Sequence, residues 1–129
     1  MTRLALHIDL LARLHLVAGW LALLVAISLA ALGFGAFGIR GEGAPDVASS
    51  LAAAVFFGLS VTFALWAGTM AAIGWSLRDR RPWARLAAIA LGVVNLFVIP
   101  FGTALAIYTA WVLLQDGAKV DFEPTDEPV

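Results

Sequence analysis

Residues 86–114 read LAAIALGVVNLFVIPFGTALAIYTAWVLL, a run without a single charged side chain. As one helix at about 1.5 Å per residue, this run would be roughly 45 Å long, whereas a hydrocarbon core is about 30 Å thick. Pro100 lacks a backbone donor and clashes with the preceding turn, and Gly102 readily adopts turn dihedrals. We therefore predict a tight helical hairpin that reverses at residues 99–102. A single kinked span or a re-entrant segment is the alternative.

The whole chain is as apolar as this run suggests. Of its 129 residues, 62% are hydrophobic and 13% are charged, and the mean hydropathy is +0.94. A soluble domain is about half apolar and about a quarter charged, so the composition predicts an all-α integral membrane protein. We expect one membrane domain, residues 1–129. The formal net charge of -1 argues against a nucleic-acid surface, and the absence of cysteine excludes disulfides and Cys-ligated zinc.

Charged residues set the limits of the predicted spans, because one charge at the bilayer centre costs at least about 2.5 kcal/mol. This rule predicts four transmembrane helices, at about 15–38, 48–77, 82–99 and 101–118. An acidic C-terminal tail, residues 119–129, should be disordered by composition. The residues before the first span form either a short interfacial helix or a simple extension of that span.

The positive residues predict the orientation of the spans. Seven of the eight lysines and arginines fall on one side of the four-span topology, which the positive-inside rule assigns to the cytoplasm. Four of them form a cluster between the second and third spans: Arg78, Arg80, Arg81 and Arg85. The topology is therefore two hairpins with both termini cytoplasmic.

Small residues at four-residue spacing predict how the spans pack, since close backbone approach stabilises helix pairs in lipid. The candidate packing residues are Ala18, Ala22, Ala26, Ser60, Ala64, Gly68, Ala72, Gly92 and Ala106. The ridge in the second span is the longest, and we expect this span to be the most enclosed helix.

Chemistry-bearing residues are scarce. No strongly ionisable residue lies in the interior of a predicted span, since Arg85 and Asp116 fall near span ends. This argues against pumps and ion-coupled transporters, and no catalytic motif is present. We expect no enzymatic activity. Near the predicted turn, Asn95 and Thr103 either satisfy backbone groups freed at Pro100 and Gly102 or line a polar path with Tyr108. His15 is either an ordinary interfacial histidine or an axial ligand for a haem or pigment.

Residues 77–86 (LRDRRPWARL), Asn95 and residues 100–114 (PFGTALAIYTAWVLL) together resemble a pattern found in small four-span bacterial inner-membrane proteins. Residues 14–19 (LHLVAG) match the His-containing start of the first span in that group. The resemblance implies the C-terminal hairpin and placement in the bacterial inner membrane. It implies no activity.

These observations favour a non-catalytic accessory or stabilising subunit that packs in or beside a larger membrane complex. Its expected partners are membrane lipids and other membrane-protein subunits, without nucleic acid and without a cofactor. One alternative is a small oligomeric transporter or lipid-handling protein. Another is a pigment- or haem-binding subunit that uses His15.

Overall fold

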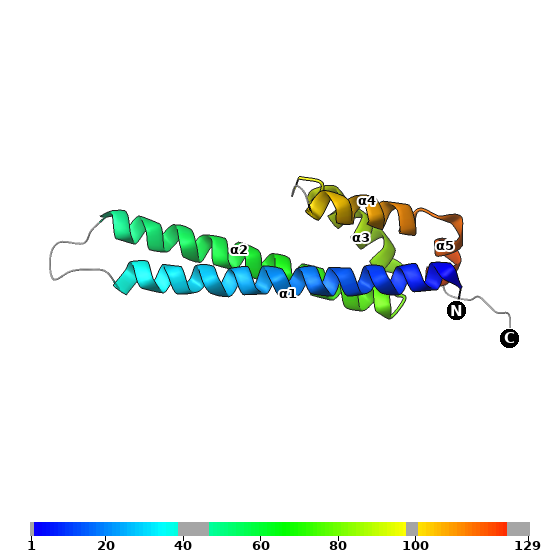
Figure 1. The fold of residues 1–129 in the computed structure, drawn as a ribbon, viewed down its shortest axis with the longest axis horizontal. Helices are drawn as coiled ribbons and strands as arrows, with labels where there is room; N and C mark the ends of the chain where they lie inside the picture. Colours follow the sequence, from blue (N-terminus) through cyan, green and yellow to red (C-terminus); the bar gives the residue numbers. More distant parts are fainter. Residues whose placement is uncertain (1, 39–46, 98–100, 124–129) are drawn as a thin grey trace. The chain divides into compact units, whose positions relative to one another are not determined.

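The computed structural model describes residues 2–38, 47–97 and 101–123, which form five helices and no strand. The helices are α1 (Arg3–Gly38), α2 (Val47–Arg78), α3 (Pro82–Asn95), α4 (Phe101–Leu113) and α5 (Asp116–Phe122) (Figure 1). The predicted all-helical class is therefore confirmed. Pro100, which was predicted to reverse the chain, lies outside the described residues.

The chain divides into two units, and α1 and α2 contribute to both. We call residues 1–16 with 71–129 the five-helix unit, and residues 17–70 the two-helix unit.

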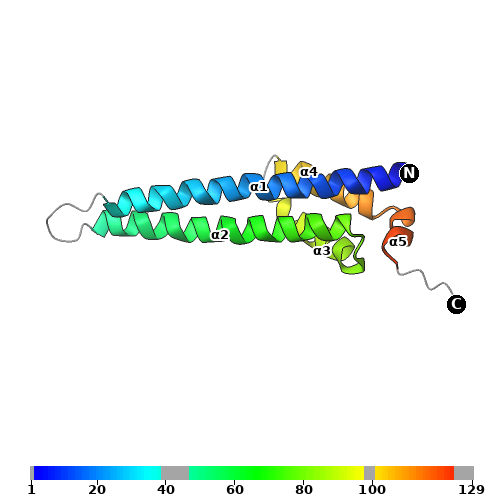
Figure 2. The same ribbon diagram turned by 90° about the horizontal axis from the view of Figure 1, so that it is seen from below.

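In the two-helix unit, α1 and α2 lie side by side (Figure 2), and most of the side chains buried there are small. The hydroxyl of Ser60 donates to the carbonyl of Ala26 at 2.8 Å, and the rings of Phe34 and Phe57 meet edge to face at 5.0 Å. At Gly33, an added Cβ would lie 3.0 Å from the Phe57 ring, so a larger residue would displace that ring. The buried apolar side chains of this unit are Ala22, Ala26, Ala53, Ala67 and Met70.

Two of the described helices are long and apolar enough to cross a membrane, by length and composition. These are α1 with 36 residues and α2 with 32 residues, about 54 and 48 Å at helical rise. By contrast, α3 has 14 residues and α4 has 13, about 21 and 20 Å. Two long apolar helices, rather than the predicted four, are therefore found in the described part of the chain.

The most apolar stretches of the two long helices are little covered by this chain. Within that stretch of α1, 17% of the residues are buried, compared with 6% for α2. In the small-residue ridge of α2, Ala64, Gly68 and Ala72 are exposed. That the second span is the most enclosed helix stays a prediction.

The five-helix unit has a core of its own. Its fully buried side chains include Ile8 and Leu11 of α1, Leu77 of α2, and Val112 and Leu113 of α4. A separate close contact joins α3 to α4. A Cβ at Gly92 would lie 3.7 Å from the Cα of Ala106, so the two backbones approach closely where both residues are small.

Several helix ends differ from their predicted positions. The first helix begins at Arg3 and continues to Gly38, so the N-terminal residues extend this helix and form no separate interfacial one. The third helix begins at Pro82, where a proline suits the first turn, but it ends at Asn95 and not at residue 99.

The fourth helix ends at Leu113 and not at residue 118, because Gln115 adopts an extended conformation and starts α5. Ala118 and Phe122 are buried, and this burial explains why part of the acidic tail forms a helix. Composition alone had predicted disorder from residue 119 onward.

Candidate functional site

The turn between α2 and α3 carries an arginine where glycine is usual. The amide of Arg80 donates to the carbonyl of Leu77 at 3.2 Å, and the amide of Arg81 donates to the carbonyl of Ser76 at 3.0 Å. This pair of bonds is the Schellman pattern that ends many helices, with its left-handed position usually filled by glycine. Arg80 occupies that position with φ of 55°. An arginine tolerated there indicates that its side chain contributes something that glycine would not.

The side chain of Arg80 connects three segments of the five-helix unit. One guanidinium nitrogen lies 3.2 Å from a carboxylate oxygen of Asp9 and donates to the carbonyl of Ala5 at 3.3 Å. The other lies 3.6 Å from a carboxylate oxygen of Asp121. The guanidinium also lies 6.0 Å from the centre of the Phe122 ring. Arg80 thus joins the N-terminal turns of α1 to α5.

A half-buried aromatic cluster joins α1 to α4. Nδ1 of His7 and the hydroxyl of Tyr108 are hydrogen-bonded at 2.9 Å. The His7 ring also meets the ring of Trp111 edge to face at 5.4 Å.

A hydrogen bond joins α3 to the end of α4 in the same unit, where Nε of Arg85 donates to the carbonyl of Leu113 at 2.8 Å. That bond satisfies a carbonyl freed where α4 ends.

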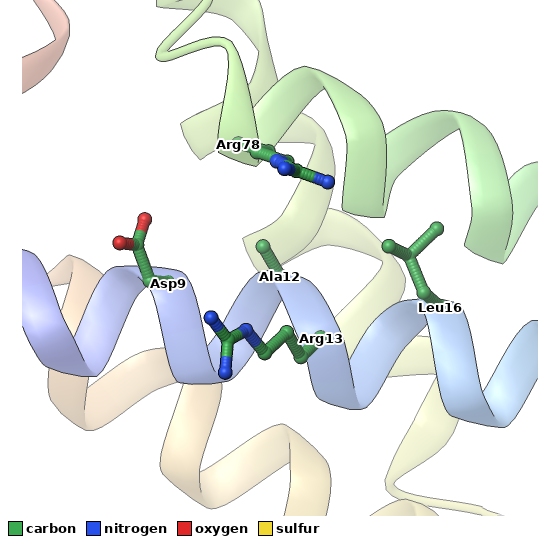
Figure 3. Close-up of a pocket in the computed structure, with 5 residues that line it drawn as sticks. All are labelled: Asp9, Ala12, Arg13, Leu16 and Arg78. Carbon is green, nitrogen blue, oxygen red and sulfur yellow. The ribbon is translucent and has the colours of Figure 1, made fainter.

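A pocket of about 350 Å³ lies between α1 and α2 in the five-helix unit. Its lining residues are Asp9, Ala12, Arg13, Leu16 and Arg78. Figure 3 shows Arg78 and Arg13 on opposite sides of the pocket, with Asp9 toward one end and Leu16 toward the other. Among the residues that the structure describes, Asp9 is paired with Arg80, whereas neither Arg13 nor Arg78 has a side-chain hydrogen bond or an ion pair.

His15 is fully buried, and its Nδ1 donates to the carbonyl of Leu11 at 2.9 Å. Its Nε2 is buried without a hydrogen-bond partner among the described residues, and so is Nδ2 of Asn95. His15 does not line the pocket. The described residues contain no group of three or more His, Cys, Asp or Glu side chains suited to a metal ion.

The residues predicted near the reversal have separate surroundings. The Thr103 hydroxyl donates to the carbonyl of Leu96 at 3.0 Å and satisfies a carbonyl at the end of α3. Gly102, in the first turn of α4, is buried, and Asn95 is buried at the end of α3. Tyr108 is hydrogen-bonded to His7. A polar path lined by Asn95, Thr103 and Tyr108 stays a prediction.

The predicted packing residues fall into three groups. Ala22, Ala26, Gly92 and Ala106 are buried within this chain. Ala18 and Ser60 are partly exposed, and Ser60 bonds across to α1. Ala64, Gly68 and Ala72 are exposed, and a Cβ at Gly68 would meet nothing within 4 Å. As packing residues these three remain predictions for contact with another molecule.

The four arginines of the predicted positive cluster have different surroundings in the structure. Arg80 is half-buried in ion pairs and Arg85 caps α4, whereas Arg78 faces the pocket and Arg81 is exposed. Sequence reasoning missed the roles of Asp9 and Arg13 as well as the pairing of His7 with Tyr108. The available signal was the presence of two polar residues, His7 and Asp9, in the first turns of α1, on either side of its buried residue Ile8. Their partners lie 101 and 71 residues away, and no local pattern reveals such pairs.

Comparison with known proteins identifies no family for this chain. No protein-family model matches the chain, and no curated protein or solved structure is significantly similar to it.

Proposed function

We propose that this chain is a non-catalytic accessory or stabilising subunit that packs in or beside a larger bacterial membrane complex. The observation that carries the proposal is the small share of buried residues in the most apolar stretches of the two long helices, 17% for α1 and 6% for α2. Large contiguous apolar patches are rare on soluble monomers. Lipid and neighbouring protein would cover this surface.

The exposed ridge on α2 supports a protein neighbour in addition to lipid. Ala64, Gly68 and Ala72 lie at four-residue spacing and are exposed, and the position of a Cβ at Gly68 is open. In lipid, helices associate through close packing of small residues rather than through the hydrophobic effect. A second helix approaching this ridge would bring its backbone close to that of α2.

Native-complex analysis tests the accessory role. The protein is extracted in a mild detergent from cells that express it at its natural level, and the intact particle is weighed by native mass spectrometry. We expect a particle far heavier than the 13.6 kDa chain, with at least one different membrane protein in it. A lone monomer, or an assembly of this chain alone, would contradict the proposal.

For the topology, we propose four spans in the bacterial inner membrane with both termini in the cytoplasm. The two long helices span fully, and α3 with α4 forms the second hairpin. The arginines that follow α2 support this orientation through the positive-inside rule. Because α3 and α4 are each about 20 Å long at helical rise, a re-entrant hairpin covered by protein is the competing arrangement.

Cysteine labelling separates these two topologies, since the chain has no native cysteine. Phe97→Cys and Phe101→Cys report on the reversal, because both side chains are 86% exposed. In the four-span topology, an impermeant maleimide labels both variants from the periplasm. The control, Val120→Cys, is labelled only after the cells are permeabilised. Failure to label positions 97 and 101 from outside would replace the second hairpin by a re-entrant one and leave the accessory role standing.

A second candidate, a haem- or pigment-binding subunit, draws support from His15. Its Nδ1 is fixed as a donor to a backbone carbonyl, and Nε2 is free, as in an imidazole oriented to ligate a metal. Complete burial of the side chain opposes this reading, so the accessory role is preferred. An absorption spectrum of the purified native complex decides between them: a band that His15→Ala removes would establish the alternative.

A further inference from the structure

The pocket between Arg13 and Arg78 has the charge balance of an anion site. Its lining carries two guanidinium groups and one carboxylate, and the carboxylate of Asp9 is already paired with Arg80 at 3.2 Å. Within the described part of the chain, the side chains of the two lining arginines make no hydrogen bond and no ion pair. Figure 3 shows them on opposite sides of the cavity. A group bound between them would meet donors from two helices.

The pocket has an apolar end at Leu16. Leu16 packs against the α2 backbone, since a Cβ at Gly74 would lie 2.9 Å from its Cγ. One turn before Arg78, and outside the lining, Trp75 is 62% exposed, and tryptophan is typical of the level where headgroups meet acyl chains. Leu16 lies one turn beyond Arg13 on α1, so the apolar end adjoins one of the two arginines.

We propose that this pocket binds the phosphate group of an anionic phospholipid. Arg13 and Arg78 each donate to phosphate oxygens, a pairing that suits the planar fork of arginine. The glycerol and acyl chains leave past Leu16 and Trp75. Basic pockets between membrane helices are established sites for lipid headgroups. The inference rests on the membrane placement proposed above, but it does not depend on a protein partner.

A volume of about 350 Å³ accommodates a headgroup, and the apolar end distinguishes lipid from free phosphate. Inorganic phosphate would use the two arginines and leave the Leu16 end unfilled. The lipid should therefore bind more tightly than the ion alone.

The test uses the full-length chain in a neutral detergent, with lipid binding measured by native mass spectrometry. The probes are phosphatidylglycerol, phosphatidylcholine and inorganic phosphate. The test variant is Arg13→Gln with Arg78→Gln, both at exposed positions. The matched control is Arg3→Gln with Arg81→Gln, which removes the same charge from two exposed residues outside the pocket. Circular dichroism verifies that both variants retain their helices.

We expect the wild type to prefer phosphatidylglycerol over phosphatidylcholine. The test variant should lose about tenfold or more in affinity for phosphatidylglycerol, and the control should retain its affinity. Equal losses in the two variants would show that general charge attracts the lipid and would overturn the site. Inorganic phosphate binding as tightly as the lipid would overturn the lipid assignment.

If the test variant does not fold, Arg78→Gln alone serves as the second variant, and unchanged phosphatidylglycerol affinity in that variant would overturn the proposal. Failure of the accessory role appears in a different measurement, the mass of the native particle. A chain that is released from membranes by a carbonate wash would contradict the membrane placement itself.

Discussion

The two units of this chain differ in the kind of side chain that they bury. The five-helix unit buries large side chains such as Leu11, Leu77 and Leu113 completely, and it connects distant segments through Arg80 and His7. In the two-helix unit the buried apolar set is small residues and one methionine, while large side chains such as Trp20 and Leu65 are 67% and 69% exposed. The five-helix unit thus has a core of large side chains, whereas the two helices of the other unit meet mainly through small ones.

The largest expected effect comes from removing a large side chain from the core. Leu77→Ala should lower the free energy of unfolding by about 2 to 5 kcal/mol, because it leaves a cavity at a fully buried position. Leu24→Ala, at a position 57% exposed, should change it by less than about 0.5 kcal/mol. Denaturant titration in detergent micelles, followed by circular dichroism, measures both. Similar losses in the two variants would contradict the contrast between the units.

Two glycines of α2 provide the next comparison. At Gly74 an added Cβ would lie 3.0 Å from the carbonyl oxygen of Ala12, whereas at Gly68 it would meet nothing within 4 Å. Gly74→Ala should therefore destabilise by about 1 to 3 kcal/mol through overpacking. Gly68→Ala should stabilise by about 0.5 to 1 kcal/mol through helix propensity. The thermal unfolding midpoint of each variant should shift in opposite directions, and a common sign would count against the described packing.

Arg80 tests the connection between α1 and α5. Arg80→Ala removes the contacts with Asp9 and Asp121 but keeps a side chain at positive φ, so it should cost about 1 to 2 kcal/mol. Arg80→Gly loses the same contacts but removes the backbone strain, and it should be more stable than Arg80→Ala by up to about 1 kcal/mol. Arg81→Ala, at an exposed position, is the control. Equal stability of all three variants would remove the role assigned to this arginine.

The smallest expected effect is the stability lost when either of two hydroxyl groups, those of Tyr108 and Thr62, is removed. Tyr108→Phe breaks the bond to His7 across 101 residues of chain and should destabilise by about 0.5 to 1.5 kcal/mol. Thr62→Val removes a bond from an exposed hydroxyl to its own helix, at the carbonyl of Gly58, and should be close to neutral. A loss for Thr62→Val as large as that for Tyr108→Phe would contradict the contrast. Both are measured by the same denaturant titration.

The helical class and several helix starts could be read from the sequence, because their causes are local. Pro82 suits the first turn of a helix, and the pairing of Pro100 with Gly102 placed a new helix start close to residue 101. The length of α2 followed from the positions of the charges, whereas α1 continues through Asp9 and Arg13 and begins at Arg3. These signals come from residues close together in the sequence, and the observed helix starts at Pro82 and Phe101 agree with them.

The remaining features depend on contacts between distant residues. The helix at Asp116–Phe122 forms because Ala118 and Phe122 are buried, and composition around them is that of a disordered tail. The pairing of Arg80 with Asp9 joins residues 71 positions apart. For the α2 ridge, spacing identified the small residues but could not say whether the facing surface belongs to this chain.

Cross-linking from the small-residue ridge of α2 is the sharpest test of whether this helix packs against another membrane protein. Gly68→Cys, in a chain with no other cysteine, is modified with a thiol-reactive benzophenone and irradiated in native membranes. Leu59→Cys is the control, because it is exposed and, at nine residues or about two and a half turns away, lies on the opposite face of the same helix. We predict a cross-link from position 68 to a different membrane protein and little or none from position 59. Cross-links from position 68 to lipid alone, or equal protein cross-links from both positions, would contradict the claim that this face of α2 packs against a partner.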